Sequence, residues 1–223
     1  MRHDSLWLFG LTVPLAIAAV TVAVGDYPAE QFDEGGVGTW ASCAFLLASA
    51  AAAFDTWRAR RDPKRFFTSA VLWLLIELAF FYLALDETFS WHEKLDRFVH
   101  RKVLHVEATE TTKRMDDWII GVYGLLALGV LYRFRDEILR VPGLVRVFAL
   151  AMALLALQVA LDGLNRPDFI RSFHDRAQRR RARTWLPVAE ETTKLVAEGV
   201  FLVGFLRARE YARGGPTRRP GTG

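Results

Sequence analysis

The chain contains a single cysteine, Cys43, among its 223 residues. This excludes an intrachain disulfide and any metal site built from several thiolates. The chain also lacks the Glu-x-x-His pattern of carboxylate-bridged di-iron bundles. A metal site here would therefore use carboxylate and imidazole ligands. We expect Cys43, which lies in an apolar stretch rich in Ala and Ser, to serve packing alone.

The chain also has no large excess of charge of one sign. The net charge is +4, and the basic residues fall in short clusters between apolar blocks. Such clusters are typical of segments that flank membrane helices. A nucleic-acid-binding surface would instead gather its basic residues on one face. We therefore expect no nucleic-acid partner.

Apolar residues make up 52% of the chain and occur in long blocks. Each block approaches the ~20 residues that a helix needs to cross a bilayer. They are too long and too continuous for barrel strands, so the sequence predicts an all-α transmembrane bundle of about six spans. We assign residues 1–208 to this domain and 209–223 to a disordered tail. The blocks lie approximately at 6–24, 37–57, 66–85, 118–134, 144–164 and 192–206.

The loop charges predict the orientation of the chain. The loop over residues 25–36 has no Lys or Arg, whereas the segment 58–65 is strongly basic. By the positive-inside rule, both termini lie in the cytoplasm of a bacterial inner membrane. The basic loop at 167–187 falls outside and conflicts with this rule. The first block is longer than a signal-peptide core of ~7–15 residues, so we expect it to be retained.

The third block ends in a dense polar stretch. Residues 86–96 contain four carboxylates and His92. We expect the helix to continue past the apolar block as far as residue 100, and at helical spacing Asp86, Glu93, Arg97 and His100 then share one face. A charge at the end of an apolar span is costly unless it is paired or faces a cavity. This stretch is therefore the first candidate for a functional site.

The topology brings further carboxylates to the same side of the membrane. The fifth block ends near Asp162, and the sixth begins at Glu191, Lys194 and Glu198. Converging carboxylates repel one another unless something compensates their charge. A metal ion, a proton, or ion pairing with basic residues such as Lys194 are the three possible compensations.

Two short motifs bear on the metal alternative. His92-Glu93-x-x-Asp96, together with Leu161-Asp162-Gly163, resembles the zinc motifs of intramembrane site-2 proteases, with Asp96 in place of the second histidine. That resemblance implies that His92, Asp96 and Asp162 are zinc ligands and that Glu93 is the general base. The stretch from Leu85 to Glu93, Leu-Asp-Glu-x4-His-Glu, resembles multi-pass bacterial membrane proteins of unassigned function.

Our leading hypothesis is a site for Zn, Mn or Fe that serves hydrolysis of a membrane-bound or lipid-derived substrate, or a structural role. Glu93 would be the base. The proposed ligands are Asp86, Glu87, His92, Asp162 and Glu191.

Two other hypotheses remain open, so the sequence does not decide whether the protein is an enzyme. Glu77 lies in the middle of the third block, where an ionisable residue is a functional candidate. With Lys194 and Glu198 it would supply the coupled charges of a small proton-coupled transporter. Alternatively, the charges only hold a non-catalytic membrane protein together.

The fifth loop has its own pattern. Between residues 167 and 187, apolar residues recur at helical spacing among many arginines. This predicts an amphipathic interfacial helix. Its arginines, from Arg176 to Arg183, would contact anionic lipid headgroups.

Overall fold

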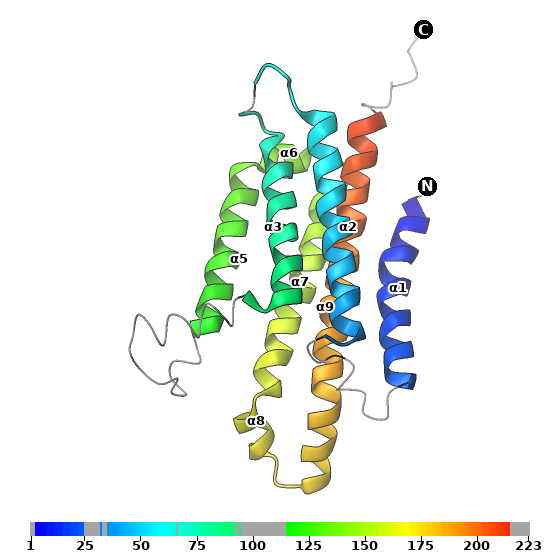
Figure 1. Cartoon of the computed structure of the whole chain (residues 1–223), viewed down its shortest axis with the longest axis vertical. Helices are drawn as coiled ribbons and strands as arrows, with labels where there is room; N and C mark the ends of the chain where they lie inside the picture. The colour runs from blue at the N-terminus through cyan, green and yellow to red at the C-terminus, as the bar shows by residue number, and fades with distance from the viewer. Residues whose placement is uncertain are drawn as a thin grey trace.

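The computed structural model describes residues 3–24, 32, 35–65, 67–91, 94 and 115–214, with backbone alone at 3–5, 24, 115–120 and 167–168. Within those ranges the named elements are all helices, which confirms the all-α class. The long helices run side by side along one axis (Figure 1). The helices are α1 (His3–Val24), α2 (Val37–Arg60), α3 (Val71–Phe89), α5 (Met115–Arg133), the short α6 (Arg135–Leu139), α7 (Leu144–Asn165), the short α8 (Pro167–Ser172) and α9 (Arg176–Gly214).

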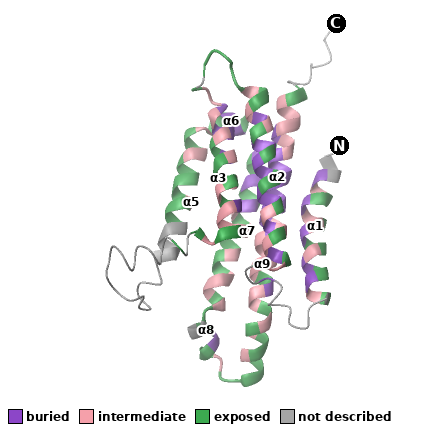
Figure 2. Cartoon of the chain, in the orientation of Figure 1, coloured by how far each residue is buried: buried purple, intermediate pink, exposed green. Residues whose placement is uncertain are grey.

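Helix α9 is the element around which the others pack. Its 39 residues extend about 58 Å at 1.5 Å per residue. It contacts α7, α2 and α1, and most of its residues between Leu195 and Ala208 are buried (Figure 2). Aromatic rings fill the centre of the bundle, where Phe205 lies 4.9 Å from Phe80 and 5.4 Å from Phe148 between ring centroids.

Helices α1 and α9 approach each other through two glycines. A Cβ atom placed on Gly199 would clash with the carbonyl oxygen of Gly10, so only glycine fits at this position. Small residues at such crossings let helix backbones come close. This contact fixes α1 against the centre of the bundle.

Three helices are long and apolar enough to cross a membrane, and they cover Leu6–Ala23, Val37–Arg60 and Leu144–Asn165. A shorter apolar helix covers Gly121–Arg133. Each of the six predicted apolar blocks overlaps a helix of the structure. Length and composition thus indicate a membrane protein, while the count of six spans remains a prediction.

The third helix ends earlier than predicted. We expected it to continue to His100, but α3 ends at Phe89. Ser90 takes a left-handed conformation (φ 47°, ψ 49°), and its N–H donates to the carbonyl of Asp86 at 2.7 Å. This backbone reversal breaks the helix before the predicted continuation. Residues 92, 93 and 95–100 lie outside the described part of the chain.

The last helix is longer than predicted at both ends. The basic segment 167–187 is not one interfacial helix; it forms α8 and, after a break, the first turns of α9, which runs through Pro187. Residues 209–214, which we placed in a disordered tail, are helical as well. Arg213 and Arg209 lie 2.7 and 3.9 Å from a carboxylate oxygen of Asp55, and these ion pairs hold the end of α9 against α2.

Candidate functional site

A lysine joins α3 to α9 through two carboxylates. The Nζ atom of Lys194 lies 2.9 Å from Oε1 of Glu87 and 2.7 Å from Oε2 of Glu191. Glu191 and Lys194 are three residues apart and share one face of α9. Glu87 reaches them from the last turns of α3. About a fifth of each side chain is exposed, so this cation is largely shielded from solvent.

A third carboxyl group lies one helical turn further along α9. Glu198 is buried, and its Oε1 accepts a hydrogen bond of 2.7 Å from the hydroxyl of Ser42 on α2. Its other oxygen, Oε2, is also buried and has no hydrogen-bond partner in the described part of the chain. A buried polar atom without a partner is uncommon in native proteins and calls for an explanation.

These residues form what we call the lysine cluster, made of Ser42, Glu87, Glu191, Lys194 and Glu198. It holds three carboxyl groups and one ammonium group. If all three carboxyl groups were ionised, the cluster would carry an excess of two negative charges in a shielded place. A proton or a further cation would relieve that excess. The arrangement can therefore store or exchange a positive charge.

A polar junction between α7 and α9 adjoins the lysine cluster. Glu190 accepts hydrogen bonds of 3.3 Å from Gln158 and 3.3 Å from Asn165. Burial and the nearby charges of Asp162 and Glu191 raise the pKa of Glu190, and these hydrogen bonds only partly oppose that rise. This junction adds more negative charge beside the cluster.

Three of the predicted metal ligands lie at the lysine cluster and at the polar junction beside it. Glu87 and Glu191 meet at the same ammonium group, whereas Asp162 interacts with Glu190. His92 and Glu93 lie outside the described residues, as does Asp96. Within the described ranges, no three His, Cys, Asp or Glu side chains gather in a way that could hold a metal ion. The metal site remains a prediction.

The three predicted intramembrane charges do not all lie in the lysine cluster. Lys194 and Glu198 belong to the lysine cluster, but Glu77 is half-buried on α3 and forms no hydrogen bond or ion pair with any residue that the structure describes. Ser42, by contrast, was not predicted as a site residue. Its run of small residues suggested packing alone, and no local pattern connects it with a carboxylate 156 residues away.

Sequence reasoning also missed a buried carboxylate at the opposite end of the bundle. Glu137 on α6 is 2% exposed. Its two carboxylate oxygens accept a bidentate pair of hydrogen bonds from Arg60, at 2.9 and 3.0 Å. Ser69 and Trp73 donate to it at 2.8 and 3.2 Å, and Arg140 lies at 3.3 Å. We call this set the Glu137 cluster. In the sequence, Glu137 stands in an arginine-rich segment between two apolar blocks, and no motif there points to a buried carboxylate.

The electrostatics of Glu137 follow from these contacts. Burial by itself raises its pKa, but the hydrogen bonds from Ser69, Arg60 and Trp73 and the charge of Arg60 outweigh burial. The pKa of Glu137 therefore lies below its ordinary value. The carboxylate is charged and fully paired, which suits a structural connection between α2, α3 and α6.

Comparison with known families places the whole helical bundle in one family. The family model described as "Domain of unknown function (DUF8692)" matches residues 5–208, so the chain belongs to that family. The match extends from the first turns of α1 into the last turns of α9. No curated protein and no solved structure matches the chain.

Proposed function

We propose that this member of the DUF8692 family is a small proton-coupled transporter of the bacterial inner membrane, with about six spans and both termini in the cytoplasm. Glu198 would exchange the proton, and Lys194 would respond to its charge. The observation that carries this proposal is the position of the Glu198 carboxyl group. It is buried, it accepts one hydrogen bond from Ser42, and its second oxygen has no partner among the described residues.

The cost of burying charge supports a protonated Glu198 in this arrangement. An ionised carboxylate away from water needs hydrogen bonds on both oxygens or a directly paired cation. Lys194, one turn away, is already engaged by Glu87 and Glu191 at 2.9 and 2.7 Å. A neutral Glu198 avoids this cost, and so a proton on Glu198 suits the contacts that it makes.

Loss of that proton would change the balance of the lysine cluster. An ionised Glu198 would attract the ammonium group of Lys194, which is four residues away on the same helix face. Lys194 would then leave Glu87, and α3 would lose its ion pair with α9. Protonation of one carboxyl group is thereby linked to the contact between two helices, which is what proton-coupled transport requires.

The test uses everted membrane vesicles that contain the full chain, with a pH gradient reported by a fluorescent dye. We expect at least one solute from a panel of inorganic cations, organic cations, amino acids and sugars to collapse the gradient with the wild type. Glu198→Gln should abolish that response. Absence of any response across the panel would contradict transport, and an equal response from Glu198→Gln would contradict the role of Glu198 in it.

A pair of serines on α2 gives a matched control. Ser42 donates to Glu198, whereas Ser49, two turns away on the same face, is buried with no hydrogen-bond partner in the described ranges. Ser42→Ala should shift the pH at which transport is half-maximal. Ser49→Ala removes the same hydroxyl group from the same kind of environment and should leave that pH unchanged.

Metal-dependent hydrolysis is the second candidate, favoured by one observation. Glu87 and Glu191 converge on a single cation. A divalent ion held there with Asp86, His92 and Asp162 would polarise a carbonyl group or activate water, with Glu93 as the base. Elemental analysis of the purified protein beside His92→Ala and Asp86→Asn decides this. Stoichiometric Zn, Mn or Fe that both variants lose would favour the metal site over transport.

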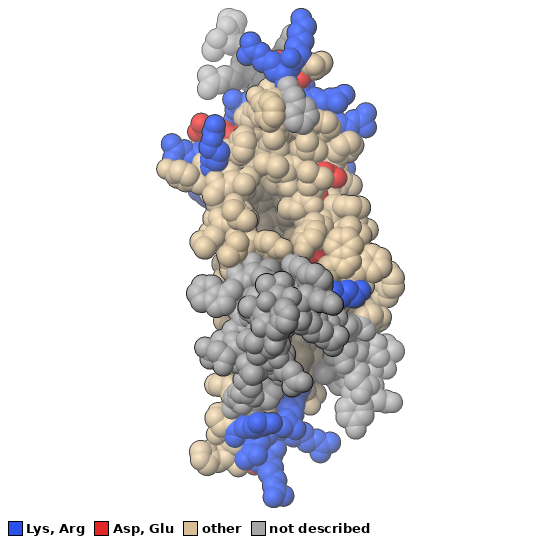
Figure 3. Space-filling view, turned by 60° about the vertical axis from the view of Figure 1, so that its left-hand side comes forward, with Lys and Arg blue, Asp and Glu red and all other residues tan. Residues whose placement is uncertain are grey.

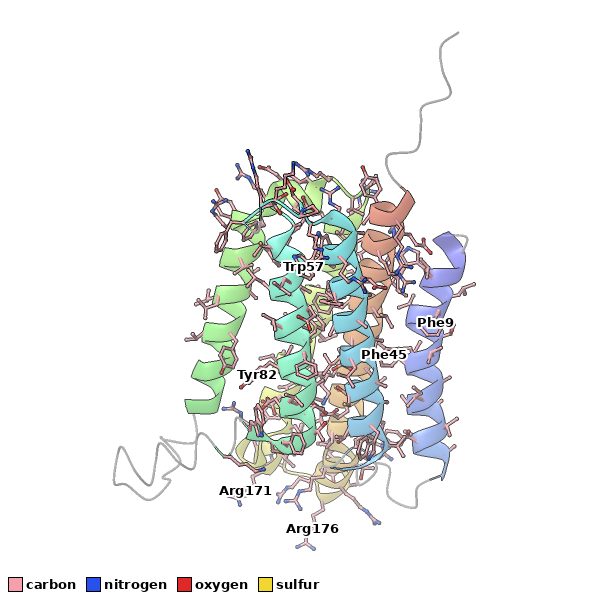
Figure 4. The ribbon with its side chains drawn as sticks, turned by 45° about the horizontal axis from the view of Figure 1, so that its top comes forward. Phe9, Phe45, Trp57, Tyr82, Arg171 and Arg176 are labelled. Carbon is pink, nitrogen blue, oxygen red and sulfur yellow. The ribbon has the colours of Figure 1, made fainter. Side chains whose placement is uncertain are left out.

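The basic end of the molecule suits contact with anionic lipid headgroups. Arg171 and Arg176 point away from the helices where α8 ends and α9 begins (Figure 4). The arginines from Arg176 to Arg183 continue along the first turns of α9. Lys and Arg side chains gather at this end and at the opposite end of the molecule (Figure 3). Such clusters attract anionic membrane surfaces.

A further inference from the structure

An open pocket lies between the start of α3, the end of α5 and α6. Its volume is about 320 Å³, within the range of roughly 300–1,000 Å³ typical of small-molecule sites. It forms because α5 makes few contacts with the other helices. One link between α5 and α3 is the edge-to-face pair of Tyr82 and Tyr123, 6.2 Å apart between centroids. Its lining includes Phe67, Thr68, Val71, Arg133, Phe134 and Asp136.

Two opposite charges line this pocket without being paired to each other. Arg133 is exposed, its guanidinium group lies 5.5 Å from the Phe134 ring centroid, and no described carboxylate forms an ion pair with it. Asp136, three residues later and also exposed, has no ion pair or hydrogen bond within the described ranges. Glu137 also lines the pocket, but its carboxylate is already paired with Arg60. One cation and one carboxylate are thus available to a ligand.

The pocket lies at the boundary of the apolar layer. The apolar part of α5 ends at Arg133, and the apolar helix α3 starts at Val71. Phe67, which lines the pocket, is 90% exposed, and Tyr132, which precedes Arg133 in the chain, is 70% exposed. Exposed aromatic side chains at the ends of apolar helices are typical of the membrane–water interface. A ligand here would place a polar group in the pocket and an apolar part against lipid.

We propose that this pocket binds the headgroup of a phospholipid that carries both a phosphate and a primary ammonium group, that is, a phosphoethanolamine lipid. Arg133 and the Thr68 hydroxyl would hold the phosphate, and Asp136 would accept hydrogen bonds from the ammonium group. The acyl chains would leave along Phe67 and Val71.

The charges of the pocket decide between headgroups. A purely anionic headgroup would leave Asp136 unpaired and repelled. A choline headgroup carries a cation but has no N–H with which to donate a hydrogen bond to Asp136. The phosphoethanolamine group satisfies both side chains at once. The pocket shares no residue with the lysine cluster, which is built from other helix turns.

The test is native mass spectrometry of the full chain in detergent, with phosphatidylethanolamine, phosphatidylglycerol and phosphatidylcholine of the same acyl chains added separately. We expect phosphatidylethanolamine to bind about tenfold more tightly than the other two, since one charge-assisted hydrogen bond is at stake. Arg133→Gln should weaken all three lipids. Asp136→Asn should remove the preference for phosphatidylethanolamine over phosphatidylglycerol.

Arg135→Gln is the matched control. Arg135 is an exposed neighbour of Arg133 whose guanidinium group lies 5.0 Å from the Tyr132 ring centroid, and it does not line the pocket. The Arg135→Gln variant should bind all three lipids as the wild type does. Equal binding of all three lipids by the wild type, or binding that neither Arg133→Gln nor Asp136→Asn alters, would overturn the proposal. Soluble phosphoethanolamine that bound as tightly as the lipid would also overturn a lipid site.

Discussion

The two buried carboxyl groups, Glu137 and Glu198, lie in opposite ends of the bundle and have opposite surroundings. Glu137 receives donors on both oxygens from Arg60, Ser69 and Trp73. Glu198 receives one donor, from Ser42, and keeps a buried oxygen without a partner in the described part of the chain. Glu137 faces an excess of positive charge, and Glu198 lies among further carboxylates.

This difference separates a structural carboxylate from a functional candidate. A fully paired group rigidifies the elements that it joins, and its protonation state changes little near neutral pH. A buried group with incomplete pairing is tolerated where its protonation is used.

Removal of the Glu137 carboxylate should cause the largest loss of stability. Glu137→Ala leaves Arg60 and Arg140 without their shared partner and leaves Ser69 and Trp73 without an acceptor. Breaking such a buried pair typically costs about 3 kcal/mol. Unfolding of the detergent-solubilised protein measures the loss. Asp136→Asn, next to it and exposed, should cost less than about 0.5 kcal/mol. Equal losses of stability for the two variants would contradict the structural role of Glu137.

Removal of the ammonium group from the lysine cluster should have the next largest effect. Lys194→Met leaves Glu87 and Glu191 facing each other without a cation, and we expect a loss of about 2 kcal/mol. Adding Glu87→Gln to Lys194→Met should restore part of this loss because the repulsion is removed. A double variant less stable than the single variant would show that the two carboxylates do not repel across the lysine.

The two serines of α2 should differ by a smaller amount. Ser42→Ala removes the donor to Glu198 and should cost about 1 kcal/mol. Ser49→Ala removes a buried hydroxyl that has no partner among the described residues, so it should be neutral or slightly stabilising. Thermal unfolding of both variants side by side provides the comparison, and the same loss from each would mean that the Ser42 hydrogen bond contributes nothing.

Acid should destabilise the wild type more than a variant that lacks the Glu137 carboxylate. Because its pKa is lowered in the folded state, the unfolded chain takes up a proton first as the pH falls. Its contribution is complete above roughly pH 4.3, the ordinary value for Glu, and is lost below it as the pH falls through the folded pKa. Melting temperatures from neutral pH downward should therefore fall less steeply for Glu137→Gln than for the wild type. Parallel curves would argue against the lowered pKa.

The sequence predicted the helices well because they depend on local pattern. All six apolar blocks coincide with helices, since uninterrupted apolar runs have few alternatives in lipid. The ends were predicted less well. Ser90 breaks α3 through a left-handed backbone, and α9 continues through Pro187 even though proline usually ends a helix. Both outcomes depend on tertiary context.

The candidate site was predicted only in part for the same reason. Glu87, Glu191, Lys194 and Glu198 were identified because they lie at the ends of apolar runs or within them, where charge is conspicuous. Ser42 was missed because a serine in a run of small residues is typical of packing. The Glu137 cluster draws on α2, the start of α3 and α6, and no spacing along one helix could reveal it.

The central claim is that Glu198 exchanges a proton while Glu137 stays charged, and infrared difference spectroscopy across a pH titration tests it directly. We predict a carbonyl stretch of a protonated, buried carboxyl group that is present near neutral pH and disappears as the pH rises. Glu198→Gln should remove this band and Glu137→Gln should retain it. A wild-type spectrum with no such band at any pH, or a band that persists in Glu198→Gln, would contradict the account.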